Sequence, residues 1–180
     1  MESMIELLRK RRSIRSYTPE PVDQESVALL VESLLRSPSS RDLKPWEFIV
    51  VDDRQLLNGL AQSKAHSASF LKNAALAVVV IADPQKCDVW IEDSSLAAIL
   101  LQMTATSLGL GSCWVQIRLR SHASGKSSEE YVRELLGIPQ HMHVLSVIGI
   151  GHPNEMKKGI PADQLEYGKV RHNGYHEPWR

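Results

Sequence analysis

The 180-residue chain predicts an α+β fold in which a small mixed β-sheet is flanked by helices. Three observations support this expectation. Four short apolar segments have the length of strands, helical segments separate them, and the connections differ in length. Neither G-x-G-x-x-G after a first strand nor G-x-x-x-x-G-K-[ST] occurs, which argues against the doubly wound nucleotide-binding folds.

Five helices are expected from apolar periodicity and capping residues. Asp23 and Ser127 have side chains that cap a helix N-terminus, and glycine or proline follows several of the helical segments. Residues 88–108 form the longest segment and are apolar on most sides, so this helix is expected to be central, covered by other elements or by a partner subunit. The expected helices are residues 2–11, the segment from Asp23 to Leu35, the segment after Asp53, residues 88–108 and the segment from Ser127 to Gly137.

Four strands are expected between these helices. Residues 75–82 are continuously apolar, as in a strand that is buried on both faces. The last 30 residues lack a strong period, so we expect one domain over residues 1–150 and a C-terminal arm over residues 151–180. The expected strands are residues 46–51, 75–82, 112–117 and 144–150.

Charge and cysteine content exclude several classes of protein. The 21 basic and 21 acidic residues give no net charge, whereas nucleic-acid and membrane-surface binders need a positive field. No apolar run reaches the length of about 18 residues that a membrane span needs, and residues 1–15 do not resemble a signal peptide. The two cysteines fit neither a disulfide framework nor a zinc site. We therefore expect a cytoplasmic protein without a metal, a membrane anchor or a nucleic-acid partner.

Two local sequence patterns are candidate binding sites. Five of the seven residues 9–15 are basic, and Arg11 and Arg12 beside Ser13 suit a phosphate because guanidinium groups are forked, charged donors. The spacing alone favours a plainer interpretation, a solvated helix C-terminus. The second pattern is the hydroxyl-rich loop that begins with residues 37–40. Its hydroxyls could hydrogen-bond the polar edge of a ligand. The same residues could instead simply end a helix before a core strand.

Four segments in order resemble the FMN-dependent nitroreductase family. Each is weak alone, but together they extend over nearly the whole chain. They are RRSIR at 11–15, SPSS at 37–40 with PWEFIVV at 45–51, LGLGSCWV at 108–115 after the Ala/Leu-rich helix, and IGIGHP at 148–153 with KKGIP at 157–161. The resemblance implies a homodimer with two FMN molecules at the interface and a C-terminal arm that extends to the partner subunit. It also implies ping-pong reduction of a small-molecule electron acceptor, such as a nitroaromatic compound or a quinone, with NAD(P)H as reductant.

The resemblance also implies roles for residues near the FMN phosphate and the pyrimidine ring. Arg11 and Ser13, together with Lys157 or Lys158 from the tail, would hold the phosphate. Arg12 would join them or contact the ribityl chain, and a cation at Arg15 would stabilise the negative charge of the reduced flavin near N1. A tail position that is often arginine in the family is Gly159 here.

Further expected contacts lie on the two remaining segments. Pro38, Ser39 and Ser40 would reach the flavin from the partner chain, and a backbone N–H of Val115 or Gln116 would face flavin N5. No side chain is expected to act as acid or base. Asp42 and Lys44 replace the usual Asn and Gln, and an ion pair of Asp42 with Lys44 or Arg41 is a candidate substitute. Arg118 would favour an anionic substrate in the pocket, or it would lie in solvent at the sheet end.

Two other functions remain open at the level of sequence. One is a flavin-binding dimer without turnover, used for storage or redox sensing. The other is a small anion-binding or structural dimer that uses the arginine cluster alone. His141 and His143 have a spacing that occurs in metal sites, but no third ligand is near them in the sequence, so no metal is expected.

Overall fold

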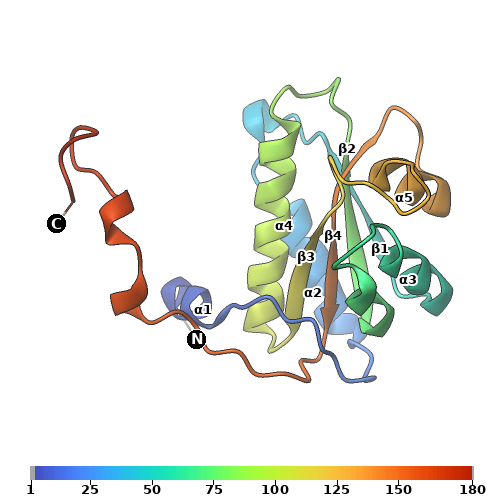
Figure 1. Ribbon diagram of the computed structural model, residues 1–180, viewed down its shortest axis with the longest axis horizontal. Helices are drawn as coiled ribbons and strands as arrows, with labels where there is room; N and C mark the ends of the chain where they lie inside the picture. The colour runs from blue at the N-terminus through green and yellow to red at the C-terminus, as the bar shows by residue number, and fades with distance from the viewer. Residues whose placement is uncertain (1–2, 180) are drawn as a thin grey trace.

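The computed structural model describes residues 3–179, which form one four-stranded sheet with helices on both faces (Figure 1). The strand order is β1-β2-β4-β3, so β1 and β3 are the edge strands. All three neighbouring pairs are antiparallel. The strands are β1 (Trp46–Val51), β2 (Leu76–Ala82), β3 (Gly111–Gln116) and β4 (His143–Gly151).

The α+β class is confirmed, but the expectation of mixed strand pairing is corrected by the antiparallel register of the four strands. A helical connection does not force a parallel pair if it returns to the end of the sheet that it left. Between β1 and β2, helix α3 (Arg54–Ala61) packs against the 3-10 helix η2 (Ser69–Asn73), and the chain doubles back. One isolated parallel bridge joins Ser13 to Ser112 at the start of β3.

Capping residues mark the ends of several helices. Asp23 accepts a hydrogen bond from the Ser26 N–H at 2.8 Å, and Ser127 accepts one from the Glu130 N–H at 3.0 Å. Gly137 ends the last α-helix with a φ of 66°, the left-handed conformation that glycine adopts without strain. The remaining α-helices are α1 (Met4–Lys10), α2 (Gln24–Leu35), α4 (Trp90–Ser107) and α5 (Ser128–Leu136).

The sheet separates two apolar cores. Helices α2 and α4 cover one face, and α3, η2 and α5 cover the other (Figure 1). Every residue of β2 is buried, as its continuous apolar run predicts, and its side chains alternate between the two cores. The sheet is therefore a rigid centre, and α4 is fixed to it along its length.

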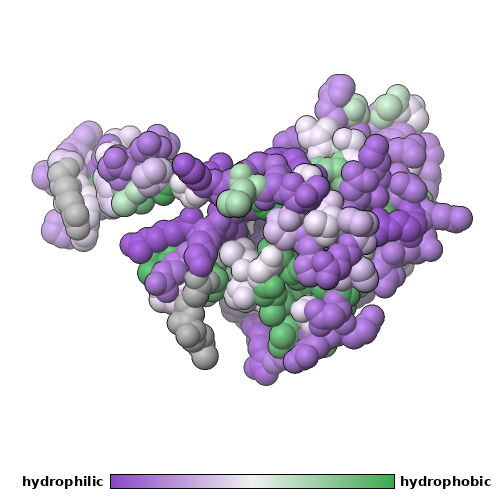
Figure 2. Space-filling model, turned by 90° about the horizontal axis from the view of Figure 1, so that it is seen from below, coloured by the Kyte–Doolittle hydropathy of each residue, from purple (hydrophilic) through white to green (hydrophobic). Residues whose placement is uncertain are grey.

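The chain after β4 runs back past α1 and away from the sheet (Figure 1). It contains two 3-10 turns, η3 (Ala162–Gln164) and η4 (Tyr167–Lys169), and every residue from 161 to 179 is exposed. Figure 2 shows this arm standing off from the body of the molecule. A cleft of about 600 Å³, lined largely by apolar side chains, lies between the arm and α1. Within residues 3–179, no helix is long and apolar enough to cross a membrane.

Candidate functional site

The first group of expected site residues lies where both ends of the chain meet β3. The Ile14 N–H donates to the Ser112 carbonyl at 3.0 Å, which fixes the N-terminal segment on the edge strand. The tail returns to the same place, because the Lys157 ammonium donates to the Ser13 carbonyl at 2.8 Å. The Arg12 guanidinium donates to the Lys158 carbonyl. We call Arg11, Arg12, Ser13, Arg15, Lys157 and Lys158 the cationic group.

A small cavity opens within this group. Its volume is about 170 Å³, and its lining includes Arg11, Arg12 and Lys157, together with Thr106 near the end of α4. The Ser112 hydroxyl, next to the Ser13 bridge, is buried and has no hydrogen-bond partner among residues 3–179. Forked guanidinium groups, an ammonium group and hydroxyls are the donors that a phosphate dianion needs. The residues present therefore fit the phosphate end of FMN.

Glu155 is a member of this site that the sequence did not reveal. Its carboxylate accepts hydrogen bonds from the backbone N–H groups of Arg15 at 2.5 Å and Ser16 at 3.2 Å. It also pairs with Lys157 at 3.0 Å. The Arg15 N–H and the Lys157 side chain hold the pKa of Glu155 below its usual 4.5. Glu155 thus fixes the N-terminal segment to the tail, whereas in the sequence it is one acid in a stretch without a period.

Gly159 explains why the tail passes so close to α1. A Cβ atom at this position would collide with the Arg9 carbonyl oxygen, which is backbone and cannot rotate away. The arginine that is common here in the family would not fit this path of the chain. Phosphate binding would therefore rest on Lys157, Lys158 and the N-terminal arginines.

The second group of expected residues lies on the loop before β1. We call residues 38–44 the hydroxyl loop. The Ser39 hydroxyl accepts from the Lys44 N–H at 2.9 Å, and Asp42 pairs with Lys44 at 2.9 Å. Of the two ion pairs that the sequence suggested for Asp42, the structure forms the one with Lys44, while Arg41 pairs with Asp88.

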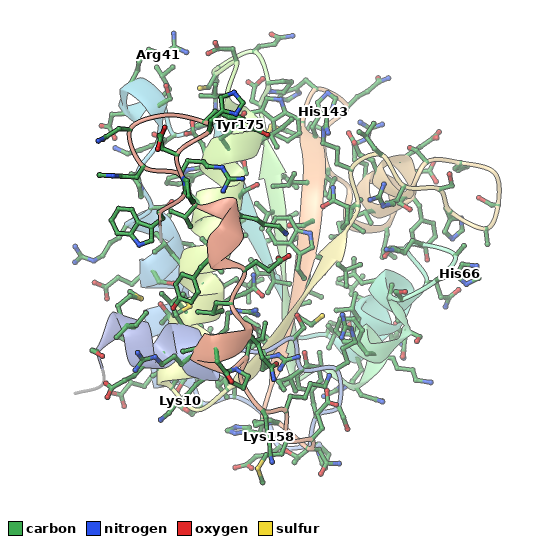
Figure 3. The ribbon with its side chains drawn as sticks, turned by 60° about the vertical axis from the view of Figure 1, so that its left-hand side comes forward. Lys10, Arg41, His66, His143, Lys158 and Tyr175 are labelled. Atoms are coloured by element: carbon green, nitrogen blue, oxygen red, sulfur yellow. The ribbon has the colours of Figure 1, made fainter. Side chains whose placement is uncertain are left out.

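The two groups lie at opposite ends of α4. Asp93, near the start of the helix, accepts from the Ser40 N–H at 2.9 Å, whereas Thr106, near its end, lines the cationic cavity. Thirteen residues of helix separate them, which is about 20 Å along the axis. Figure 3 shows the same separation, with Arg41 at one end of the molecule and Lys10 and Lys158 at the other.

Strand β3 connects the two ends along an open edge of the sheet. Backbone groups in an antiparallel strand point alternately toward and away from the neighbouring strand. The Ser112 carbonyl faces away from β4 because it bonds Ile14, so the backbone of Gln116, four residues on, also faces the open edge. The Val115 N–H faces β4, and its side chain is buried. Gln116 is therefore the better placed of the two candidates for a flavin N–H contact.

Arg118 lies just beyond β3, at the same end of the molecule as the start of α4. Its guanidinium carbon is 5.8 Å from the centre of the Trp90 ring, a cation–π distance. Its backbone carbonyl accepts from the Gln116 amide at 3.0 Å. The side chain is half-buried and has no ion-pair partner among the residues that the structure describes. It is thus available to an anionic group.

The described residues contain no cluster of three or more histidine, cysteine or acidic side chains that could hold a metal ion. His143 instead pairs with Glu129 at 3.0 Å and packs against Trp90 with ring centres 5.6 Å apart. Cys87 and Cys113 are both free and buried. Burial raises the pKa of the Cys113 thiol, which keeps it protonated.

Comparisons with known proteins agree with the fold. Residues 8–69 and 58–152 match the model of the nitroreductase family. A protein of Archaeoglobus fulgidus proposed to be an NADH dehydrogenase/NAD(P)H nitroreductase is 34% identical over 167 residues, which cover 91% of this chain and 92% of that protein. NADPH-flavin oxidoreductase of Vibrio harveyi is 29% identical, with 98% of this chain and 76% of the relative covered.

A solved structure gives the same result. FMN-dependent nitroreductase from Clostridium difficile R20291 aligns with a TM-score of 0.93 at 45% identity, with 95% of this chain and 99% of that chain covered. The fold is that of a class of flavin-dependent oxidoreductases. This chain belongs to the nitroreductase family.

Proposed function

We propose that this protein uses NAD(P)H to reduce electron-poor small molecules, such as nitroaromatic compounds and quinones, by a ping-pong route with FMN as cofactor. The broader class, a flavin-dependent NAD(P)H oxidoreductase, follows from its membership of the family. The observation that carries the proposal is the cavity of about 170 Å³ around Arg11, Arg12 and Lys157 at the start of β3. Bound FMN supplies two-electron transfer, and the chain supplies its position and its electrostatic surroundings.

The cationic group would hold the cofactor by its phosphate end. Arg11 would neutralise part of the charge of a dianion, together with Lys157, whose ammonium also pairs with Glu155. The hydroxyl of Ser13 would add a short donor. Arg12 already donates to the Lys158 carbonyl, so part of its role is to hold the tail over the site. Arg15, whose backbone is fixed by Glu155, would place its positive charge beside the pyrimidine ring.

The open edge of β3 would orient the ring system. The Gln116 N–H faces this edge, where it can donate to a ring nitrogen of the cofactor. Its side chain is held from both sides, because its amide oxygen accepts from the Trp114 indole at 3.0 Å and its amide nitrogen donates to Arg118. No side chain has to move a proton for the electron transfer, so these residues position and do not catalyse.

We also propose a homodimer in which each FMN is held by both copies. Within one copy, the hydroxyl loop and the cationic group lie at opposite ends of α4. A two-fold axis across α4 would bring the loop of one copy to the cationic group of the other. The exposed side of α4 suits such a contact, because Leu96 and Ile99 are 46% and 38% exposed there. The arm would then extend over the partner subunit.

A visible spectrum of the purified protein tests the proposal. We expect a yellow protein whose released flavin is FMN and whose colour bleaches on anaerobic titration with NADH or NADPH. A protein that takes up FMN but never bleaches would instead be a flavin-binding dimer without turnover. A colourless protein that cannot be loaded with FMN would contradict both. A cytoplasmic location remains a prediction from the sequence.

A further inference from the structure

Asp93 is a buried carboxylate whose partners all lie outside its own helix. Its side chain is on α4, and the residue is 3% exposed. One oxygen accepts from the Ser40 N–H at 2.9 Å, and the other is 3.5 Å from the Cys87 sulfur, which donates to it. Burying a carboxylate is costly unless it is hydrogen-bonded, so these two contacts are what makes the position tolerable. Asp93 is therefore more than an acidic residue near a helix N-terminus.

The loop that Asp93 holds is strained. Arg41, Asp42 and Lys44 have φ angles of 53°, 55° and 46°, in the left-handed region that residues other than glycine seldom adopt. Three such residues in a stretch of four persist only where the surroundings impose the conformation. Asp93 anchors this loop at the Ser40 backbone, deep against α4.

The Cys87 thiol links this anchor to the next residue of the loop. Its sulfur lies 3.9 Å from the Arg41 guanidinium and 3.5 Å from Asp93. Arg41 also pairs with Asp88. Consecutive loop residues, Ser40 and Arg41, are thus tied to the turn before α4 and to α4 itself.

We infer that Asp93, supported by Cys87, is a positioning residue that sets Ser39 and Ser40 for contact with FMN in the site of a second copy of this chain. The inference rests on the proposed function, because it assigns the loop to that cofactor. Asp93 itself is covered by the loop and does not touch the cofactor. It acts by holding the Ser40 backbone, and with it the two hydroxyls, in one conformation.

FMN titration of three variants tests this role. Asp93→Ala removes both contacts and should raise the dissociation constant of FMN about tenfold or more, the value of one buried hydrogen bond to a charged group. Asp93→Asn keeps an oxygen for the Ser40 N–H and should restore the dissociation constant to within about threefold of wild type. The visible circular dichroism of bound FMN should change in Asp93→Ala and return in Asp93→Asn.

The matched control is Asp53→Ala. Asp53 caps α3 through the N–H groups of Gln55 and Leu56, on the opposite face of the sheet. Loss of this cap should lower the melting temperature by about 2–4 °C while FMN affinity stays that of wild type. An equal loss of FMN affinity in Asp53→Ala and Asp93→Ala would mean that general destabilisation is the cause, and it would overturn the inference.

A second pair of variants covers the case in which Asp93→Ala does not fold. Ser40→Pro removes the N–H group that donates to the Asp93 carboxylate. The extended Ser39 backbone (φ −140°, ψ 154°) is compatible with a following proline. Ser40→Ala removes only the hydroxyl. We expect Ser40→Pro to bind FMN about fivefold or more weakly than Ser40→Ala, and equal affinities would overturn the inference. If wild type binds FMN and the Asp93 variants bind it with the same dissociation constant, the inference about Asp93 is wrong, but the proposed function is not contradicted. If wild type takes up no FMN, both fall.

Discussion

The two ends of α4 carry two candidate binding groups that are built in different ways. At its C-terminal end, the cationic group is assembled from both ends of the chain, and we propose that it binds through charge. At its N-terminal end, the hydroxyl loop is a short continuous segment with three residues at positive φ and one buried anchor. We propose that this loop binds through its shape. Charge attracts over several ångströms and tolerates small displacements. Hydroxyl contacts do not, so we expect the loop to depend more strongly on a rigid support than the cationic group does.

The largest expected effect tests the cationic group. Arg11→Ala with Arg15→Ala should weaken FMN binding about 100-fold, because two charge-assisted contacts are lost. Fluorescence titration of FMN measures the dissociation constant. The control is Arg36→Ala, which removes an exposed cation that pairs with Glu32 on α2. Full FMN occupancy in the double variant would show that the phosphate and pyrimidine ends are placed wrongly.

The salt dependence of FMN binding should differ between the cationic group and the hydroxyl loop. Binding through the cationic group should weaken as ionic strength rises, because charges that are partly exposed are screened. The double arginine variant should lose most of this salt dependence, and Asp93→Ala should keep it. FMN titration of each variant at about 0.05 and 0.5 M salt measures this difference. An equal salt dependence in all three proteins would contradict the division into a charged end and a shaped end.

A smaller effect is expected for Glu155→Gln, which weakens the link between the tail and the N-terminal segment. We expect about fivefold weaker FMN binding, because the amide still accepts a hydrogen bond but no longer pairs with Lys157.

The pKa of Glu155 is lowered in the folded state, so its stabilising effect is present above pH 4.5 and is lost as the pH falls through the folded value. The gap in melting temperature between wild type and variant should be constant from pH 7 to pH 5 and should narrow as the pH falls below 4.5. A gap that does not narrow at acidic pH would contradict this role.

The smallest effect concerns the substrate. Arg118→Gln should raise the KM for 4-nitrobenzoate about threefold and leave the KM for 4-nitrobenzamide unchanged, because a half-exposed charge contributes little. Arg120→Gln, at an exposed position two residues on, is the control. Equal changes for both substrates would assign Arg118 to the solvent-exposed sheet end.

Local patterns predicted the elements well. β1 has the predicted bounds, β2 begins one residue late, and the helix predicted at 88–108 spans Trp90–Ser107. β2 and α4 are long apolar runs, and proline or glycine marks one end of each segment: Pro45 precedes β1, Pro84 follows β2 and Gly109 follows α4. The antiparallel pairing could not be predicted in the same way, because it depends on α3 and η2 packing against each other.

The residues of the candidate site that the sequence did not reveal all make their contacts with residues that are far away in the chain. Glu155 meets Arg15 across 140 positions and Asp93 meets Ser40 across 53. No spacing rule connects such residues. Asp93 in particular resembles an ordinary first-turn acid, and only its burial and its two partners show that it holds a loop.

The most direct test of the account is a mixed dimer of Asp93→Ala with Arg11→Ala/Arg15→Ala, isolated with two different affinity tags. If each FMN is held by the cationic group of one copy and the hydroxyl loop of the other, one site of the mixed dimer has both parts intact and the other has neither. The mixed dimer should then bind one FMN with nearly the affinity of wild type, although both parent variants bind weakly. If it binds no FMN tightly, the two groups do not meet across a dimer interface, and the central claim is wrong.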